Sequence, residues 1–388
     1  MSYTRREFGR LAFAGIPAAA AAYGTDVFTA FAQTKPNSVI EGVQIGTITY
    51  SFRSMADQSA EATLKYVVDS GISAIELMGG PIESFAGAPT GGGRGPGGPG
   101  GPEGAPSARG GRGRGERGAA STELPPGATR GSWHGIECVV PAPAGARGGG
   151  GEPGGGGRGR GEVSPEQQAA QQEQAAKMKA WRTSVSMDAF KKLRKMYNDA
   201  GVTIYATKML NENMSDEEFE YVFNVAEALG ANHTTLELLT NENQLKRVGD
   251  FAMKRKIYAA YHTHTQGAMT AFDRAFALSN GNKANVDFGH WVAAGNVGGT
   301  PMQFLEKHHD RIASFHLKDR TLPEHCALNL PWGTGETPIK EILQLVKKNK
   351  WKIPASIELE YQVPDGSDAV KETRTCVEYC RNALTART

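Results

Sequence analysis

The chain has 388 residues, enough for one large domain or two ordinary ones. Its 43 Lys and Arg residues nearly balance 41 Asp and Glu residues, and the net charge of +2 argues against a polyanionic partner such as nucleic acid. Four cysteines are too few and too scattered for a disulfide scaffold. Cys376 and Cys380 lie four residues apart in a helical pattern, so we expect them to pack as small apolar side chains.

Residues 1–32 have the composition of a leader rather than of a folded element. Arg5 and Arg6 precede a short, Ala-rich, mildly apolar run, and small residues before Gln33 offer a cleavage site. The run is too short and too weakly apolar for a membrane span, which needs about 20 residues. The segment resembles a twin-arginine export leader and predicts an exported, periplasmic protein, with an ordinary basic helix start as the alternative.

Residues 86–170 form a low-complexity insertion that is rich in Gly, Pro and Arg. Such a segment buries too little apolar surface to offset its backbone entropy, so we expect it to be disordered. Arg-Gly runs can bind nucleic acid, but aromatic residues are nearly absent and acids dilute the charge, which favours a solvated loop. The stretch Gly131–Pro141 contains Trp133 and is a candidate for docking on the folded body.

The remainder, about 260 residues, has the usual size of a (β/α)₈ barrel. In chain order the apolar patterns predict strands at 43–52, 73–78, 202–210, 232–239, 257–264, 284–291, 312–319 and 354–361. Amphipathic helices are expected at 59–71, 188–201, 215–230, 242–256, 271–279, 301–311, 338–349 and 368–385. Alternating strands and helices imply a parallel sheet, and eight units close into a TIM barrel spanning 43–388. A doubly wound open sheet is less favoured because the first strand is not followed by a Gly-rich phosphate turn.

Acids and imidazoles stand at the carboxyl ends of most of these strands, where side chains of a barrel point into one mouth. Period-2 alternation puts His316 and Lys318 on one face of their strand, and Glu358 and Glu360 on one face of theirs. A shared divalent cation explains why separate strands each bring such a group. The candidate ligands are Glu237, Asp287, His316 and one of Glu358 or Glu360, and the candidate ions are Mn²⁺, Mg²⁺, Co²⁺ and Zn²⁺. Ion pairs of these acids with Lys318 or Arg320 are the alternative.

The motifs NVDFGHW, FHLKDR, TLEL and SIELEY, in their positions along such a barrel, resemble the sugar phosphate isomerase/epimerase family with the xylose isomerase-like barrel. The resemblance runs from about Val43 to the C-terminus, interrupted by the insertion. It implies that one divalent metal is bound by Glu237, Asp287, His316 and Glu358. It also implies that Glu237 and Glu358 exchange protons with the substrate and that His290 and Arg320 hold its hydroxyls.

Each of the other polar or aromatic residues at the mouth allows two interpretations. His262 and His264 either serve the site or are core histidines; the family often has His-Asn-His here, and this chain has Thr263 instead. Lys318 either binds substrate or neutralises Glu360. Trp291 either stacks on a sugar or packs in the core. The predicted substrate contacts are therefore His290, Arg320, His264, Lys318, Trp291 and Glu360.

The sequence favours a metal-dependent sugar isomerase or epimerase that removes a proton next to a carbonyl through an enediolate. A lyase or dehydratase on keto-sugars or 3-keto-glycosides would use the same metal and bases. A phosphodiesterase like endonuclease IV is less favoured because it needs further His ligands, which the strand ending in ATKML lacks. A non-catalytic sugar-binding barrel is the remaining reading. The expected partner is a small sugar or glycoside, and a homo-oligomer is compatible with the sequence.

Overall fold

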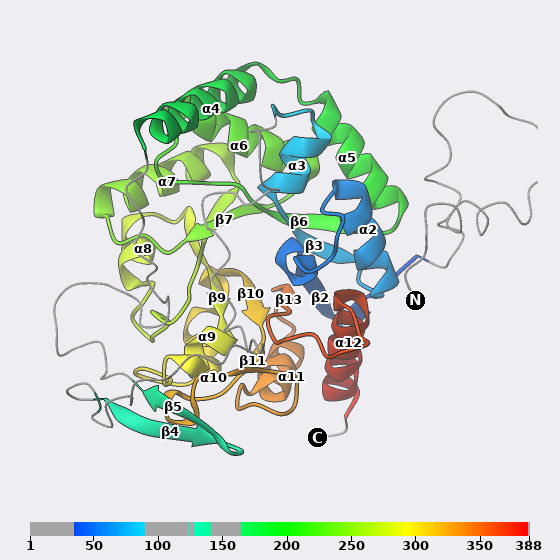
Figure 1. The fold of residues 1–388 in the computed structure, drawn as a ribbon, viewed down its shortest axis with the longest axis vertical. Coiled ribbons are helices and arrows are strands. Elements are labelled where there is room, and N and C mark those ends of the chain that lie inside the picture. The colour runs from blue at the N-terminus through cyan, green and yellow to red at the C-terminus, as the bar shows by residue number, and fades with distance from the viewer. Residues whose placement is uncertain (1–34, 90–123, 125–127, 141–163, 387–388) are drawn as a thin grey trace, which may run out of the picture.

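The computed structural model describes residues 35–89, 124, 128–140 and 164–386 (Figure 1). The predicted leader at 1–32 and much of the predicted insertion lie outside these residues. The predicted barrel is confirmed: apart from β1 (Val39–Ile40), which pairs antiparallel with β2, the strands of the nine-stranded sheet are parallel, and a β2–β3 pairing closes it. The barrel strands are β2 (Val43–Ile48), β3 (Ala74–Met78), β6 (Thr203–Lys208), β7 (His233–Glu237), β8 (Tyr258–His262), β9 (Asn282–Asp287), β10 (Ile312–Leu317) and β13 (Ala355–Ile357).

Helices surround the barrel at the places where the apolar periodicity predicts them (Figure 1). They are α2 (Ala60–Asp69), α5 (Asp188–Asp199), α6 (Asp216–Leu229), α7 (Glu242–Arg255), α8 (Asp273–Leu278), α10 (Pro301–His308), α11 (Ile339–Asn349) and α12 (Ala369–Thr385). α6 begins with a capping box, in which Ser215 and Glu218 each bond the other's backbone N–H, and Gly230 ends the helix at φ 78°. Cys376 and Cys380 are free and buried on α12, as predicted.

All eight barrel strands are shorter than their sequence patterns, and at two of them polar residues leave the ladder at the mouth. β9 ends at Asp287, whose side chain caps the short helix α9 (Phe288–Ala293), and β13 ends before Glu358. Short elements that the pattern did not predict fill the loops. They are η2 (Thr49–Phe52), α3 (Gly79–Phe85), η3 (His309–Arg311), β11 (Asp319–Arg320), η4 (Pro323–His325) and β12 (Asn329–Leu330).

The prediction of disorder throughout 86–170 is wrong for two described parts of that segment. β4 (Thr129–Trp133) and β5 (Ile136–Val140) form an antiparallel hairpin. α4 (Pro165–Ser184) begins inside the predicted segment with a capping box on Ser164. Arg182 holds α4 to the barrel through ion pairs at 2.8 Å with Glu83 and 3.1 Å with Glu218. Helix capping and contacts with the barrel therefore stabilise these elements, although their own sequences contain few apolar residues.

The hairpin is tethered covalently to the barrel. Cys138 of β5 and Cys326, which follows η4, form a disulfide with their Cα atoms 5.6 Å apart. The composition excluded only a multi-disulfide scaffold and did not predict this pair, because the two cysteines lie 188 residues apart in the sequence. The docking expected for this stretch thus takes place against the loop that follows β11.

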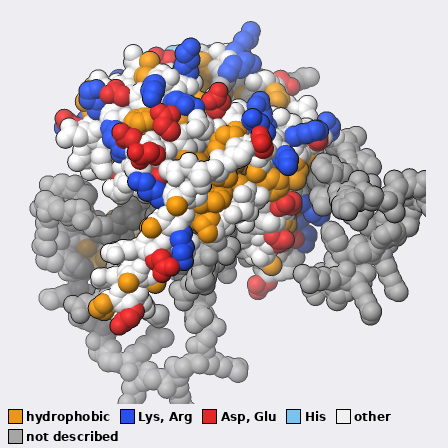
Figure 2. All heavy atoms as spheres, turned by 90° about the horizontal axis from the view of Figure 1, so that it is seen from above, with side chains coloured by type: hydrophobic (Ala, Val, Ile, Leu, Met, Phe, Trp, Pro, Cys, Tyr) orange, Lys and Arg blue, Asp and Glu red, His pale blue; other side chains and the backbone are white. Residues whose placement is uncertain are grey.

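Figure 2 shows acidic and basic side chains interspersed around a patch of hydrophobic side chains on the face seen from above. No helix among the described residues is long and apolar enough to cross a membrane.

Candidate active site

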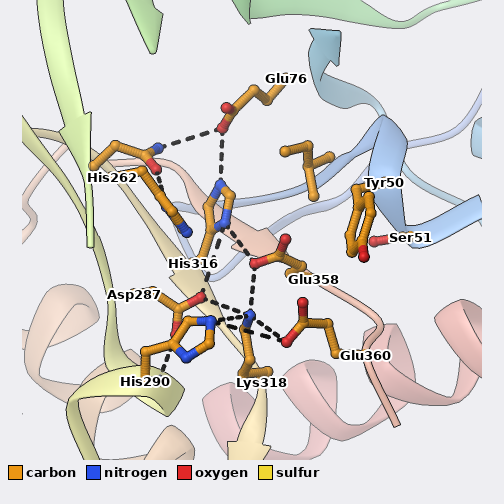
Figure 3. A network of polar contacts seen from close by, with 12 residues as sticks. Tyr50, Ser51, Glu76, His262, Asp287, His290, His316, Lys318, Glu358 and Glu360 are labelled. Atoms are coloured by element: carbon orange, nitrogen blue, oxygen red, sulfur yellow. Dashed lines mark hydrogen bonds and ion pairs between the residues drawn. The ribbon is translucent and has the colours of Figure 1, made fainter. Parts of the chain in front are cut away.

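Four buried side chains converge at the mouth of the barrel (Figure 3). They belong to different strand ends, β8, β9, β10 and the residue after β13, and each offers one ligand atom within 4.8 Å of the others: His262, Asp287, His316 and Glu358. The parallel register accounts for the meeting, because His316 lies opposite Asp287 on one side and Ser356 on the other. The prediction that separate strands bring acids and imidazoles to one point is thereby met for Asp287, His316 and Glu358.

His316 lies between two carboxylates. Its Nδ1 is 2.9 Å from Glu358 Oε2, and its Nε2 is 2.8 Å from Glu76 Oε2. Burial alone would lower the pKa of His316, but the carboxylates of Glu358 and Glu76 outweigh it and raise the pKa to about 10. His316 outweighs burial in turn at Glu76, whose pKa falls to about 2. Without a metal the ring is therefore an imidazolium held in one orientation.

Glu76 also fixes the second imidazole of the cluster. It accepts hydrogen bonds from Thr235 Oγ1 at 2.6 Å and from the amide Nδ2 of Asn285 at 3.3 Å. The carbonyl oxygen of Asn285 then accepts from Nδ1 of His262 at 2.9 Å. Because Nδ1 of His262 carries the proton and burial lowers its pKa to about 3, Nε2 holds a lone pair. One buried acid thus sets the orientation of both histidines.

The sequence analysis did not include Glu76 among the candidate site residues, although it stands near the end of the strand predicted at 73–78. The available signal was an acid inside the otherwise apolar strand AIELM, since a fully buried carboxylate requires a partner. The partners come from β7, β9 and β10, so only the closed barrel identifies them.

The two carboxylate oxygens of Asp287 have different roles, one in capping a helix and one in the site. Oδ1 accepts the backbone N–H of His290 at 2.7 Å and caps α9. Oδ2 is buried and makes no hydrogen bond, although it lies 3.1 Å from Nζ of Lys318. Burial raises the pKa of Asp287 to about 6 against the opposing effect of Lys318. A buried carboxylate oxygen with a free lone pair is a donor that suits a cation.

Lys318 supplies the positive charge nearest to these acids, and its side chain is 2% exposed. Its Nζ lies 2.6 Å from Glu360, 2.9 Å from Glu358 and 3.0 Å from Nε2 of His290. Burial would lower the pKa of the ammonium, but Asp287 and the two glutamates outweigh it and raise the pKa. The predicted alternation is confirmed, because His316 and Lys318 contact the same carboxylate. The ion-pair alternative is also present, with Lys318 neutralising Glu360 and its neighbours.

Arg320 and His290 form the next layer of the mouth. Nη1 of Arg320 lies 2.5 Å from Nδ1 of His290, and Nη2 donates to the carbonyl oxygen of Ala327 at 2.6 Å. Burial, followed by the charges of Lys318 and Arg320, holds the pKa of His290 well below its usual value. His290 is therefore neutral between two cations.

Glu237 ends β7 next to His262 of the neighbouring strand β8, but it lies outside the group of four. Its carboxylate is 2.9 Å from Nζ of Lys208 and 3.4 Å from Nδ1 of His264, and its side chain is 47% exposed. Burial would raise the pKa of Glu237, but His262 and Lys208 outweigh it and lower the pKa to about 2. The structure thus puts His262, rather than Glu237, beside the other three predicted ligands. Sequence reasoning did not select Lys208, because a single lysine at a strand end is an ordinary residue.

The expectation that Trp291 stacks on a sugar is not met. Its side chain is fully buried on α9, its Nε1 donates to the carbonyl of Gly299 at 3.0 Å, and its ring packs 4.9 Å from that of Phe304. The packing alternative holds because α9 turns this side chain away from the mouth and into the core. Tyr50 of η2 lies beside Glu358 in Figure 3 and is the aromatic side chain labelled at the mouth.

The chemistry of the four donors fits a divalent cation. Two carboxylates and two imidazoles suit Mn²⁺, Co²⁺ or Zn²⁺, and Oδ2 of Asp287 and Nε2 of His262 have lone pairs ready. To bind a cation, His316 would have to release the proton from Nδ1. The contact with Glu76 favours this form, because it keeps the other proton on Nε2.

Comparison with known proteins places the fold. The family model described as a xylose isomerase-like TIM barrel matches residues 173–380, just over half of the chain. No curated protein matches. An uncharacterised protein from Parabacteroides distasonis has 18% identity and a TM-score of 0.48, with 88% of this chain and 99% of that chain covered. A sugar phosphate isomerase/epimerase from the same organism has 13% identity and a TM-score of 0.48, with 89% and 96% covered. A probable 3-DHS dehydratase from Bacillus anthracis has 12% identity and a TM-score of 0.49, with 89% and 100% covered.

Proposed function

The chain belongs to the family of xylose isomerase-like TIM barrels, and from this premise we propose that it is a divalent-metal-dependent sugar isomerase or epimerase. The observation that carries the proposal is the buried group of two carboxylates and two imidazoles beside the ionised, half-exposed Glu237. Such an arrangement suits removal of a proton from the carbon next to a carbonyl. Family membership alone would not assign a reaction, since one fold hosts many.

Metal binding is assigned to His262, Asp287, His316 and Glu358, and Glu237 is the register neighbour of His262 on the adjacent strand. A bound cation supplies positive charge where the substrate oxygens become more negative. The pKa of about 2 keeps Glu237 ionised at neutral pH, so it can accept a proton. Glu358, also ionised, comes from a different part of the barrel wall. Two carboxylates on different sides of one carbon are what an epimerase requires.

The substrate hydroxyls are assigned to the polar groups around this centre. Arg320 and His290 lie together on one side, and Glu360 reaches the same side through Lys318. His264 lies between these groups and Glu237, with its ring 4.8 Å from that of His290 and its Nδ1 3.4 Å from the carboxylate of Glu237. Open-chain or cyclic sugars offer hydroxyls on several carbons, which such a ring of donors and acceptors can read.

A lyase acting on keto-sugars or 3-keto-glycosides is the second candidate, and Lys208 favours it. Loss of a leaving group next to the abstracted proton requires an acid as well as a base. The ammonium of Lys208 lies 2.9 Å from the carboxylate of Glu237 and is 24% exposed, so an acid stands directly beside the base.

We also propose that the protein is exported, as the leader-like residues 1–32 predict. The disulfide between Cys138 and Cys326 supports this, because disulfides persist in oxidising compartments. An exported enzyme meets unphosphorylated sugars or glycosides. Replacing Arg5 and Arg6 by Lys should retain the protein inside the cell, and fractionation of wild type and variant tests the proposal.

The reaction is tested by solvent isotope exchange. The protein is stripped with a chelator, reloaded with Mn²⁺, and incubated in D₂O with ketoses or 3-keto-glycosides. Deuterium at the carbon beside the carbonyl with an intact skeleton supports the isomerase or epimerase, whereas label with loss of water or an aglycone supports the lyase. Equal exchange by the stripped protein would contradict metal dependence. No exchange by the metal-loaded wild type with any of these sugars would favour a sugar-binding barrel.

A further inference from the structure

The β4–β5 hairpin packs directly against the loop that follows β11. Besides the disulfide, the ring of Trp133 lies 5.0 Å from that of His325. Gly131 of β4 approaches the same loop so closely that a Cβ there would lie 2.5 Å from the carbonyl oxygen of Glu324. A backbone-to-backbone approach of this kind leaves no room for a side chain. The hairpin therefore touches η4 through covalent, aromatic and backbone contacts.

The loop itself has an unusual backbone at the cysteine. Cys326 and Ala327 are consecutive non-glycine residues with φ of 74° and 46°, which side chains disfavour. Ala327 N–H donates to the carbonyl of Leu322 at 3.0 Å, and Leu328 N–H donates to Oγ1 of Thr321 at 2.7 Å. Conformations of this kind persist where surrounding contacts over-determine them, and the disulfide is one of those contacts.

This backbone turn leads directly to the substrate side of the site. The carbonyl oxygen of Ala327 accepts from Nη2 of Arg320, while Nη1 of the same guanidinium lies against Nδ1 of His290. A continuous series of contacts thus runs from the disulfide through the Ala327 carbonyl and the Arg320 guanidinium to His290, which touches Lys318.

We propose that the hairpin of the insertion is a positioning element for Arg320, acting through the Cys138–Cys326 disulfide and the Ala327 carbonyl. The hairpin makes no contact with the reacting groups and holds the guanidinium against His290 in the orientation that binds a sugar hydroxyl. That last consequence rests on the proposed function, whereas the placement of Arg320 does not.

A purely stabilising disulfide is the rival explanation, and selective labelling separates the two. Dithiothreitol delivers two electrons and two protons to the Cys138–Cys326 bond, giving two thiols and cyclic oxidised dithiothreitol. Phenylglyoxal labelling of individual arginines is then followed by peptide mass spectrometry. Arg53 is the internal control, because its guanidinium is also bonded to backbone carbonyls, those of Leu359 and Glu360.

On reduction, labelling of Arg320 should accelerate several-fold while labelling of Arg53 stays constant. Unchanged labelling of Arg320 would overturn the proposal, and so would an equal acceleration at both arginines, which is the signature of general loosening. A Gly131→Ala variant, with its disulfide intact, should give the same selective acceleration because the added Cβ displaces the hairpin. The control on the same hairpin is Val139→Ser, whose side chain is 52% exposed and which should change neither arginine.

A double-mutant cycle tests the functional consequence. In the deuterium-exchange reaction with D-fructose, or with whichever 3-keto-glycoside exchanges, the paired change of Cys138 and Cys326 to Ser should raise KM about tenfold, the size of one charged hydrogen bond, with kcat little changed. In an Arg320→Ala background the same pair of changes should have no further effect. Additive effects would overturn the proposal. If no sugar exchanges, the proposed function fails, and the labelling result alone decides the positioning role.

Discussion

Two lysines stand in the mouth of the barrel, each bonded to a glutamate, in opposite surroundings. Lys318 lies 2.6 Å from Glu360 with its side chain 2% exposed, and Lys208 lies 2.9 Å from Glu237, whose side chain is 47% exposed. The buried side is a fully engaged charge cluster, in which removing one charge leaves others without compensation. On the other, more open side Lys208 and Glu237 are 24% and 47% exposed, so water can compensate for part of the interaction when one of these charges changes. The site thus separates a stability-determining half from a reactive half.

The largest effect is expected on the open side, from Glu237→Gln. The amide keeps nearly the same size but has no basicity, and turnover should fall by about 10²–10⁴-fold, as for loss of a general base. Mn²⁺ affinity should change much less, because the four buried donors remain. Deuterium-exchange rates and calorimetric Mn²⁺ titration measure the two quantities.

The matched control is Glu242→Gln, an exposed acid at the start of α7 that pairs with Arg274 at 2.9 Å. It should change neither quantity. Near-normal turnover of Glu237→Gln would remove this residue from the catalytic assignment and leave Glu358 as the base.

On the buried side, Lys318→Met should affect stability first. Without a metal, Asp287, Glu358 and Glu360 lose their shared counter-ion, and the free energy of unfolding should fall by about 3–5 kcal/mol, the range for breaking a buried pair. Losing Lys318 removes the charge that opposes burial at Asp287, so the pKa of that carboxyl rises further above 3.8. The loss should therefore be greatest at high pH and shrink as the pH falls and the carboxyl becomes protonated.

Urea unfolding with and without Mn²⁺ measures this change. A bound divalent cation should restore part of the lost stability, because it supplies positive charge to the same carboxylates. A loss below about 1 kcal/mol without metal, the range of exposed pairs, would show that the acids do not depend on Lys318.

A smaller effect, on Mn²⁺ affinity, is expected from Glu76→Gln, a change at the carboxylate that contacts His316. The amide can still bond Thr235, but it is a poor partner for Nε2 of His316 and disturbs the amide of Asn285. Loss of such a supporting contact should weaken Mn²⁺ binding about 10–100-fold. Glu83→Gln is the matched control, since Glu83 is paired with Arg182 on the outer side of the barrel; it should alter stability and leave Mn²⁺ affinity unchanged. Equal Mn²⁺ affinity of Glu76→Gln and wild type would show that His316 is oriented by other contacts.

Most of the barrel could be predicted from the sequence because each βα unit carries its own signals. Period, capping residues and terminal glycines locate α6 without reference to the rest of the fold. The strand-end rule likewise selects Glu237, Asp287, His316 and one of Glu358 or Glu360, since parallel strands deliver their carboxyl ends to one mouth, and the structure groups three of these with His262.

The rest depends on contacts between distant segments. Trp291 follows a strand end, yet α9 starts at Phe288 and carries its side chain into the core. The role of Glu76 depends on partners that only barrel closure supplies. The hairpin and its disulfide join residues 188 apart, for which composition gives no register. Local pattern therefore located the elements and the mouth, whereas pairing across the barrel decided which side chains meet.

The smallest effect on stability is expected from Lys208→Met, the counterpart of Lys318→Met on the open side. The pair with Glu237 is partly exposed, so water replaces the ammonium and the free energy of unfolding should fall by about 0.2–1 kcal/mol. Added salt should reduce the difference from wild type, whereas Mn²⁺ should not restore it, because Lys208 touches none of the four buried donors. Parallel urea titrations of the two methionine variants measure both values under identical conditions. Losses of equal size would show that the two halves of the mouth share one charge network, and the division into a stability-determining half and a reactive half would then fail.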